Sequence, residues 1–253
     1  MPLNFLRTLS GRRRTARANR QLGALLALVA GAVNAGGFLA VHQYTSHMSG
    51  IVSSVADHLV LGNILLVLAG VASLLFFLAG AACTAIMINW ARHRNLHGEY
   101  SLSLIAEALL LLLFGVLGAH LDAFVAITVP LTVLLLCFIM GLQNAIMAKM
   151  SNSEIRTTHL TGVVTDLGIE LGRMLYWNRS RRRDAADYVG ARWSRVALQV
   201  TILSMFFVGG ILGAIGFKYL GFSTVLPFSI SLFVVALVPL MDDVGALVGG
   251  RRE

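Results

Sequence analysis

The chain has 253 residues, of which 57% are hydrophobic and only 13% are charged, and its mean hydropathy is +0.78. Because a soluble domain carries about 25% charged residues, this composition excludes an ordinary soluble protein and predicts an all-α protein that crosses a membrane several times. The net charge of +8 arises from 20 Lys and Arg residues against 12 Asp and Glu residues. Cys83 and Cys137 both lie inside apolar runs, which argues against a disulfide framework.

The first 20 residues form a basic tail without an acidic residue. Next to a hydrophobic span, such a tail indicates a cytoplasmic anchor on anionic membrane lipid and not a nucleic-acid-binding arm. About 20 helical residues are needed to cross a bilayer. Six stretches satisfy this length and are the predicted spans, at residues 21–41, 64–90, 102–119, 123–148, 196–217 and 222–240.

Two shorter amphipathic segments, residues 51–61 and 162–177, interrupt the series of spans. The second segment places Asp166, Glu170 and Arg173 on one helical stripe, opposite an apolar side. Both segments are too short to cross a bilayer. We therefore expect each of them to be a broken, re-entrant or interfacial helix.

A repeated polar motif precedes each amphipathic segment. Residues 45–53 and 157–165 both fit the pattern T-[ST]-H-[ML]-[ST]-G-[IV]-V-[ST], and the similar fragments 31–35 and 141–145 lie upstream at nearly equal distances. Two linked motifs in the same order predict two related halves. We divide the chain into a tail at 1–20, a first three-helix repeat at 21–121, a second at 122–245 and a C-terminal tail at 246–253.

The distribution of positive charge predicts the topology, because cytoplasmic loops of membrane proteins are enriched in Lys and Arg. With six spans, 19 of the 20 Lys and Arg residues fall on one side, and only Lys218 falls on the other. Both termini are therefore expected in the cytoplasm. Three spans separate equivalent points of the two halves, so the halves are expected to be inverted relative to each other, as in many secondary transporters whose substrate site lies between repeats.

The repeated motif supplies the candidate site. In each copy a hydroxyl residue and a glycine stand where the N-cap of the amphipathic helix is expected, and a helix N-terminus attracts anions. Histidines, threonines and the asparagines of the adjoining spans would border the same cavity. The residues predicted to bind a small polar or anionic solute are Asn34, Thr45, His47, Ser49, Gly50, Asn144, Thr157, Thr158, His159, Thr161, Gly162 and Asp166.

These patterns leave alternatives open. Each motif could simply cap a helix that lies on the membrane surface, and Asn34 and Asn144 could form ordinary interhelical hydrogen bonds. Glu107 is expected to reach water near the cytoplasmic end of its span, with a proton relay as the alternative. Neither motif histidine has a second histidine four residues away, and the chain contains no Walker motif, dinucleotide fingerprint or Ser-His-Asp elbow. No metal, cofactor or enzymatic activity is therefore predicted.

At these residues the chain resembles the YoaK family, bacterial membrane proteins grouped under a domain of unknown function. The resemblance rests on segments 31–38, 45–50, 140–145, 156–162 and 165–172, and it extends over about residues 20–245. It implies a multi-pass protein of the bacterial inner membrane with about six spans. Asn34 stands where many members look to have Asp, and Ile51 stands where they look to have Asn.

The function predicted from these features is a secondary transporter or channel for a small polar or anionic solute, with membrane lipid and the solute as partners and no nucleic acid. Glycine-lined faces on the first and fifth spans allow a homodimer. One alternative is a non-catalytic interaction or scaffold protein that uses the basic loop at residues 179–183. The other alternative is a metal-dependent intramembrane hydrolase.

Overall fold

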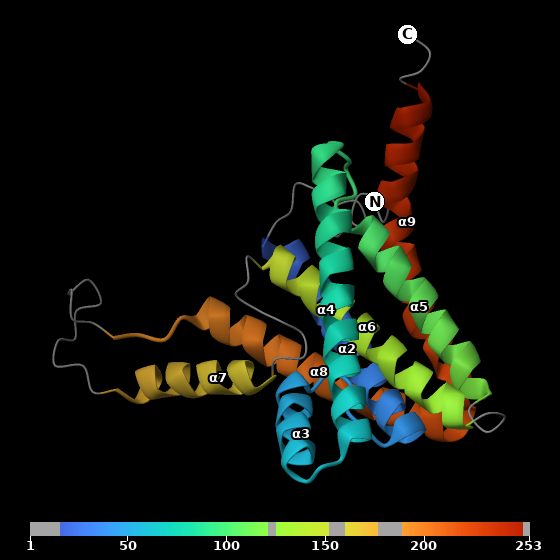
Figure 1. Cartoon of the computed structure of the whole chain (residues 1–253). Helices are drawn as coiled ribbons and strands as arrows, with labels where there is room; N and C mark the ends of the chain where they lie inside the picture. Colours follow the sequence, from blue (N-terminus) through green and yellow to red (C-terminus); the bar gives the residue numbers. More distant parts are fainter. Residues whose placement is uncertain (1–15, 121–124, 152–159, 177–188, 250–253) are drawn as a thin grey trace.

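The computed structural model describes residues 16–120, 125–151, 160–176 and 189–249. In these residues all regular structure is helical, as predicted. The long helices are α2 (Ala16–Val41), α4 (Ile64–His93), α5 (Ser101–Ala119), α6 (Val125–Met150), α8 (Trp193–Leu220) and α9 (Val225–Gly249) (Figure 1). Two shorter helices, α3 (Met48–Val60) and α7 (Leu160–Leu175), and a 3₁₀ turn, η1 (Gly221–Thr224), complete the fold.

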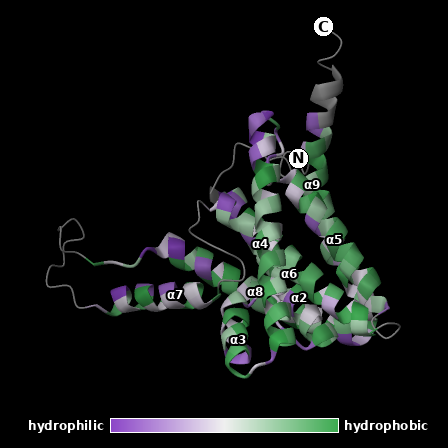
Figure 2. Cartoon of the chain, in the orientation of Figure 1, coloured by the Kyte–Doolittle hydropathy of each residue, from purple (hydrophilic) through white to green (hydrophobic). Residues whose placement is uncertain are grey.

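Five segments of the described residues are long and apolar enough to cross a membrane: Arg17–Val41, Ile64–His93, Ser101–Ala119, Val125–Met150 and Trp193–Asp243. The fifth segment contains two helices, α8 and α9, with η1 between them. The long helices are predominantly hydrophobic along their length (Figure 2). In the most apolar 18-residue stretch of α4, only 11% is buried inside the molecule. Most of the surface of α4 is therefore suited to contact lipid.

Each short helix pairs with the long helix that follows it in sequence. Figure 1 shows α3 beside the first turns of α4, and α7 beside the first turns of α8. The α3–α4 hairpin turns at Gly62, whose positive φ of 74° is a conformation that favours glycine. The Asn63 N–H then donates to the His58 carbonyl, which ends α3 and places α4 antiparallel to it.

Glycines allow α2 and α8 to approach with their backbones in contact. A Cβ atom at Gly31 would collide with the carbonyl oxygen of Phe206, and one at Gly209 would collide with the carbonyl oxygen of Leu28. Small residues at such crossings replace side-chain packing by direct backbone contact, which is typical of membrane helices. At this crossing the glycines of the first and fifth predicted spans pack against each other within one chain.

The crossing of α4 with α6 repeats this arrangement. A Cβ atom at Gly141 would collide with the carbonyl oxygen of Phe77, and one at Gly80 would collide with that of Phe138. The two residues on α6 lie 110 residues after their counterparts on α2, and the two on α4 lie 129 residues before their counterparts on α8. The two crossings therefore use corresponding positions in the same register.

The boundaries predicted from the sequence agree with the helices to within about five residues, except at the end of α9. Hydropathy predicts that this helix ends near residue 240, but it continues to Gly249. Hydropathy falls at Asp242 and Asp243, yet the helix persists because the buried Asp243 carboxylate accepts hydrogen bonds from the backbone N–H groups of His97 and Gly98, at 2.6 and 2.9 Å. The predicted boundary between the repeats, at residue 121, lies outside the described residues.

Candidate functional site

A cavity of about 620 Å³ lies where the first repeated motif meets the second half of the chain. Residues 46–49 of the first motif line it, together with Phe77 and Ala81 of α4 and Thr161 of α7. The remaining wall is contributed by α6, through Gly141, Asn144, Ala145 and Ala148. We call this space the motif cavity. It brings together five of the residues that the sequence predicts to bind solute: His47, Ser49, Asn144 and Thr161 by lining it, and Gly50 through its contact with His47.

The first motif spans the N-terminal end of α3. His47 precedes the helix, and its carbonyl accepts the N–H of Ile51 at 3.1 Å. The imidazole ring lies so close to Gly50 that a Cβ atom there would collide with it. Glycine at this position therefore lets the exposed His47 ring fold back over the first turn of the helix.

The prediction that Ser49 and Thr161 stand at N-cap positions is wrong. α3 already begins at Met48, after an N-cap residue, His47, whose side chain makes no capping hydrogen bond. Thr161 lies inside α7, whose described part begins at Leu160. Helical geometry starts earlier than the hydroxyl residues suggest because the carbonyl of His47 already accepts the first intrahelical bond of α3.

Asn144 and Asn34 occupy two different cavities. Asn144 is buried at the wall of the motif cavity, and its Nδ2 donates to the Met140 carbonyl at 2.8 Å. Asn34 is half-buried and lines a smaller cavity of about 260 Å³ between α2 and α8. We call this second space the α2–α8 cavity.

The two cavities correspond in position. Four α2 residues of the α2–α8 cavity lie 110 residues before the α6 residues of the motif cavity, and two α8 residues lie 129 residues after its α4 residues. The pairs are Gly31 with Gly141, Asn34 with Asn144, Ala35 with Ala145, Phe38 with Ala148, Phe206 with Phe77 and Gly210 with Ala81. Tyr44 also lines the α2–α8 cavity, and its ring stacks on Phe38 with centroids 4.7 Å apart.

Comparison with known proteins gives the family. The family described as "Protein of unknown function (DUF1275)" matches residues 22–238. The chain belongs to this family. It is also similar to the UPF0700 transmembrane protein YoaK of Bacillus subtilis (strain 168), with 27% identity over 205 residues, covering 79% of this chain and 85% of that relative. The resemblance predicted from the motifs is confirmed. No solved structure matches the chain.

In this DUF1275 member, the other predicted site residues that the structure describes do not line the motif cavity. Thr45 is 1% exposed, and its Oγ1 has no hydrogen-bond partner among the described residues. Gly162 follows Thr161 in α7 but is not part of the cavity wall. Asp166 belongs to a separate contact between α7 and α8. The predicted residues Thr157, Thr158 and His159, and the basic loop at 179–183, lie outside the described residues.

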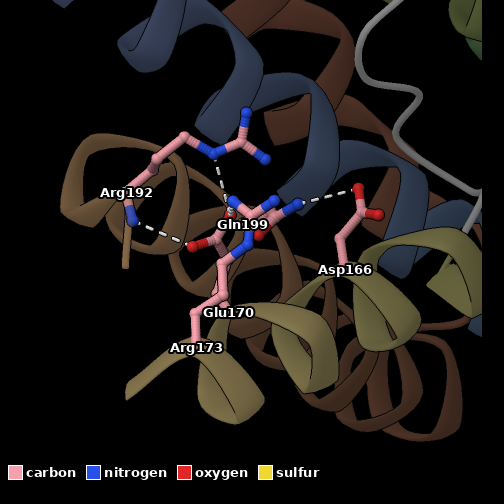
Figure 3. Close-up of polar contacts among 5 residues, drawn as sticks. All are labelled: Asp166, Glu170, Arg173, Arg192 and Gln199. Atoms are coloured by element: carbon pink, nitrogen blue, oxygen red, sulfur yellow. Dashed lines mark hydrogen bonds and ion pairs between the residues drawn. The ribbon is translucent and has the colours of Figure 1, made fainter. Parts of the chain in front are cut away.

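The contact of α7 with α8 is a cluster of charged and amide groups (Figure 3). The buried Glu170 accepts bonds at 3.0 Å from Arg173 Nη1 and Arg192 Nε, and at 2.8 Å from the Arg192 N–H. Asp166 Oδ2 accepts a bond at 2.9 Å from Gln199 Nε2. The backbone N–H of Arg192 lowers the pKa of the Glu170 carboxyl, and the two guanidinium groups act in the same direction. We call these five residues the α7–α8 clamp.

In this DUF1275 protein the prediction that Glu107 reaches water is wrong. Its side chain is 0% exposed, and Gln143 Nε2 donates to its Oε1 at 2.6 Å. The sequence places Glu107 near the end of its helix, but nothing in the local sequence indicates that α6 packs over this side chain. In the part of the chain that the structure describes, no group of three or more His, Cys, Asp or Glu residues could hold a metal ion.

Proposed function

We propose that this DUF1275 protein is a secondary transporter or channel for a small polar or anionic solute in the bacterial inner membrane. The observation that carries the proposal is the motif cavity, which residues 46–49 of the first half and Asn144 and Thr161 of the second half line together. Its volume of about 620 Å³ lies within the ~300–1,000 Å³ range of small-molecule sites. No residue of the described cavity wall is acidic, which favours an anion or a neutral polar solute.

The lining groups are suited to such a solute. α3 begins at the cavity, and the N–H groups of its first turn supply a positive electrostatic end for an anion. The exposed His47 ring, the Ser49 and Thr161 hydroxyls and the Asn144 amide add hydrogen-bonding groups from both halves. Apolar residues of α4 and α6 form the rest of the wall, so a bound solute would be oriented by few polar contacts.

We further propose six spans with both termini in the cytoplasm. A straight helix of the 51 residues in the fifth apolar segment would be about 76 Å long at 1.5 Å per residue, more than twice the ~30 Å hydrocarbon core. Gly221, with a positive φ of 62°, separates α8 from α9 within this segment. The break supports two spans here and a total of six.

The proposed halves have opposite orientations in the membrane, because three spans lie between equivalent points. Two findings support this arrangement: the corresponding glycine crossings and the corresponding walls of the two cavities. In inverted-repeat transporters, rocking of one repeat against the other exposes the site to each side in turn. The motif cavity and the α2–α8 cavity would then be the counterparts that open to opposite sides.

Uptake into proteoliposomes tests this function. A panel of labelled small anions and neutral polar solutes is compared for the protein, for empty liposomes and for His47→Ala, Asn144→Leu and Thr161→Val. Ser54→Ala, an exposed position of α3 outside the cavity wall, is the matched control. We expect uptake of at least one solute that falls several-fold in the cavity variants and is unchanged in Ser54→Ala. Uptake equal to empty liposomes throughout the panel, or equal in all variants, would contradict the proposal.

A further inference from the structure

Glu107 of α5 and Gln143 of α6 form an isolated polar pair inside the helix bundle. Both side chains are 0% exposed. Gln143 Nε2 donates to Glu107 Oε1 at 2.6 Å and to the Leu26 carbonyl of α2 at 3.2 Å. Two buried oxygens, Glu107 Oε2 and Gln143 Oε1, are left without a hydrogen-bond partner among the described residues.

The surroundings of Glu107 disfavour a negative charge. Leu104, Ala108 and Leu111 on the same helix are buried, and no described Lys, Arg or His side chain forms an ion pair with the carboxyl group. The elements α4, α6, α9 and η1 pack against α5, and among the described residues the uncharged Gln143 amide is the side chain that hydrogen-bonds to Glu107. An ionised carboxylate with one amide donor is costly in such an apolar interior, whereas a neutral carboxylic acid is not.

A neutral acid also resolves the unpaired oxygens. A proton on Glu107 Oε2 needs an acceptor. Gln143 Oε1 belongs to the amide group that already donates to Glu107, and it has no hydrogen-bond partner among the described residues. An acid and an amide side chain can exchange two hydrogen bonds in this way, N–H to carboxyl oxygen and O–H to amide oxygen. Binding of a proton would therefore close the contact between α5 and α6, and its release to water would require the two groups to separate.

We propose that Glu107 is an exchangeable proton-binding site, positioned by Gln143, which couples the proposed transport to proton movement. This inference rests on the proposed function. The structural link is that Gln143 directly precedes Asn144, a wall residue of the motif cavity. A shift of α6 at the cavity would move Gln143 relative to Glu107. On proton uptake the O–H bond forms at Oε2, and on release the proton passes to water.

The Glu107–Gln143 pair takes one residue from each half of the chain, and it has no counterpart at the repeat-related position of Gln143. The residue 110 positions before Gln143 is Val33, which is 2% exposed and apolar. The corresponding place in α2 therefore cannot hydrogen-bond a carboxyl group. We expect one coupled proton per chain and not two.

Infrared spectroscopy of the purified protein in lipid tests proton binding without any solute. The C=O stretch of a protonated carboxylic acid is resolved from that of a carboxylate and shifts in D₂O when its proton exchanges. We expect this band at neutral pH in the unmodified protein, its loss in Glu107→Gln and its retention in Asp57→Asn, an exposed control carboxyl. Gln143→Leu should keep the band but move it to higher frequency, because the acid loses its hydrogen-bond partner. Absence of the band at neutral pH, or its persistence in Glu107→Gln, would overturn the proton site.

A second measurement tests the coupling separately. For the small anion or neutral polar solute that gives the largest uptake, accumulation is measured with and without an imposed pH gradient. The gradient should stimulate accumulation by the unmodified protein and by Asp57→Asn, while Glu107→Gln should retain only exchange down the solute gradient. Uptake that responds equally in Glu107→Gln would overturn the coupling but leave transport intact. If no solute is taken up, the proposed function and the coupling fail together, and the infrared band still decides whether Glu107 binds a proton.

Discussion

Ser46 donates a 2.8 Å hydrogen bond from its Oγ to Oδ1 of Asn34. Ser46 lines the motif cavity and Asn34 lines the α2–α8 cavity, so this bond connects the walls of the two spaces. It also joins the first repeated motif to α2, the helix that contains the upstream fragment 31–35. A movement of the motif would therefore break or strain a bond to the wall of the counterpart cavity.

Substitution of a crossing glycine should destabilise the helix bundle. Gly31→Ala or Gly141→Ala introduces a methyl group against a backbone carbonyl, of Phe206 or Phe77, which cannot rotate away. We expect a loss of about 1–3 kcal/mol or more, the range for overpacking, measured as a lower thermal unfolding temperature in detergent. Gly172→Ala is the matched control, because a Cβ atom at Gly172 would have no neighbour within 4 Å and helical Ala is favoured over Gly by ~1 kcal/mol. Equal unfolding temperatures for Gly31→Ala and Gly172→Ala would refute the packing argument.

Gly50→Ala should reduce solute uptake more than it reduces thermal stability. The added methyl group meets the imidazole of His47, which is a side chain and can rotate aside. We expect an unfolding temperature close to that of the unmodified protein, together with uptake reduced to the level of His47→Ala. A double variant with both substitutions should then be no worse than either alone. Additive losses would show that Gly50 acts independently of His47.

The stability of the α7–α8 clamp should depend on pH through the carboxyl group of Glu170. Its carboxyl pKa is lowered in the folded protein from the ordinary value of 4.5, so its stabilising effect is fully present above that value and is lost as the pH falls through the folded pKa. At neutral pH, Glu170→Gln should increase hydrogen exchange in α7, because Arg173 and Arg192 lose their charged acceptor. At a pH below the folded pKa the difference should disappear. The exposed Asp57→Asn variant controls for a general charge effect, and a difference that persists unchanged at acid pH would be inconsistent with this role.

Most helices could be predicted from the sequence because they begin and end near a change in hydropathy or a glycine, and the end of α9 is the exception. Gly62 and Gly221 mark the turn between α3 and α4 and the break between α8 and α9. The first His-containing motif indicated one wall of the cavity, although α3 begins earlier in it than its Ser-Gly pair suggests. Partners across the bundle could not be predicted in the same way. Nothing in the local sequence of Glu107 indicates that Gln143 covers it, and the stripe of Asp166 and Glu170 does not reveal Arg192 or Gln199 as partners. Such contacts depend on helix packing and not on local periodicity.

Cysteine accessibility at Asn34 and Asn144 tests the inverted arrangement of the two halves most directly. Asn34→Cys and Asn144→Cys are made separately in a Cys83→Ala, Cys137→Ala background, and a membrane-impermeant thiol reagent is applied to right-side-out or inside-out vesicles. Ser54→Cys serves as an exposed reference position on α3. We predict that the reagent reaches Asn34→Cys from one side of the membrane and Asn144→Cys from the other. Labelling of both positions from the same side would contradict the account.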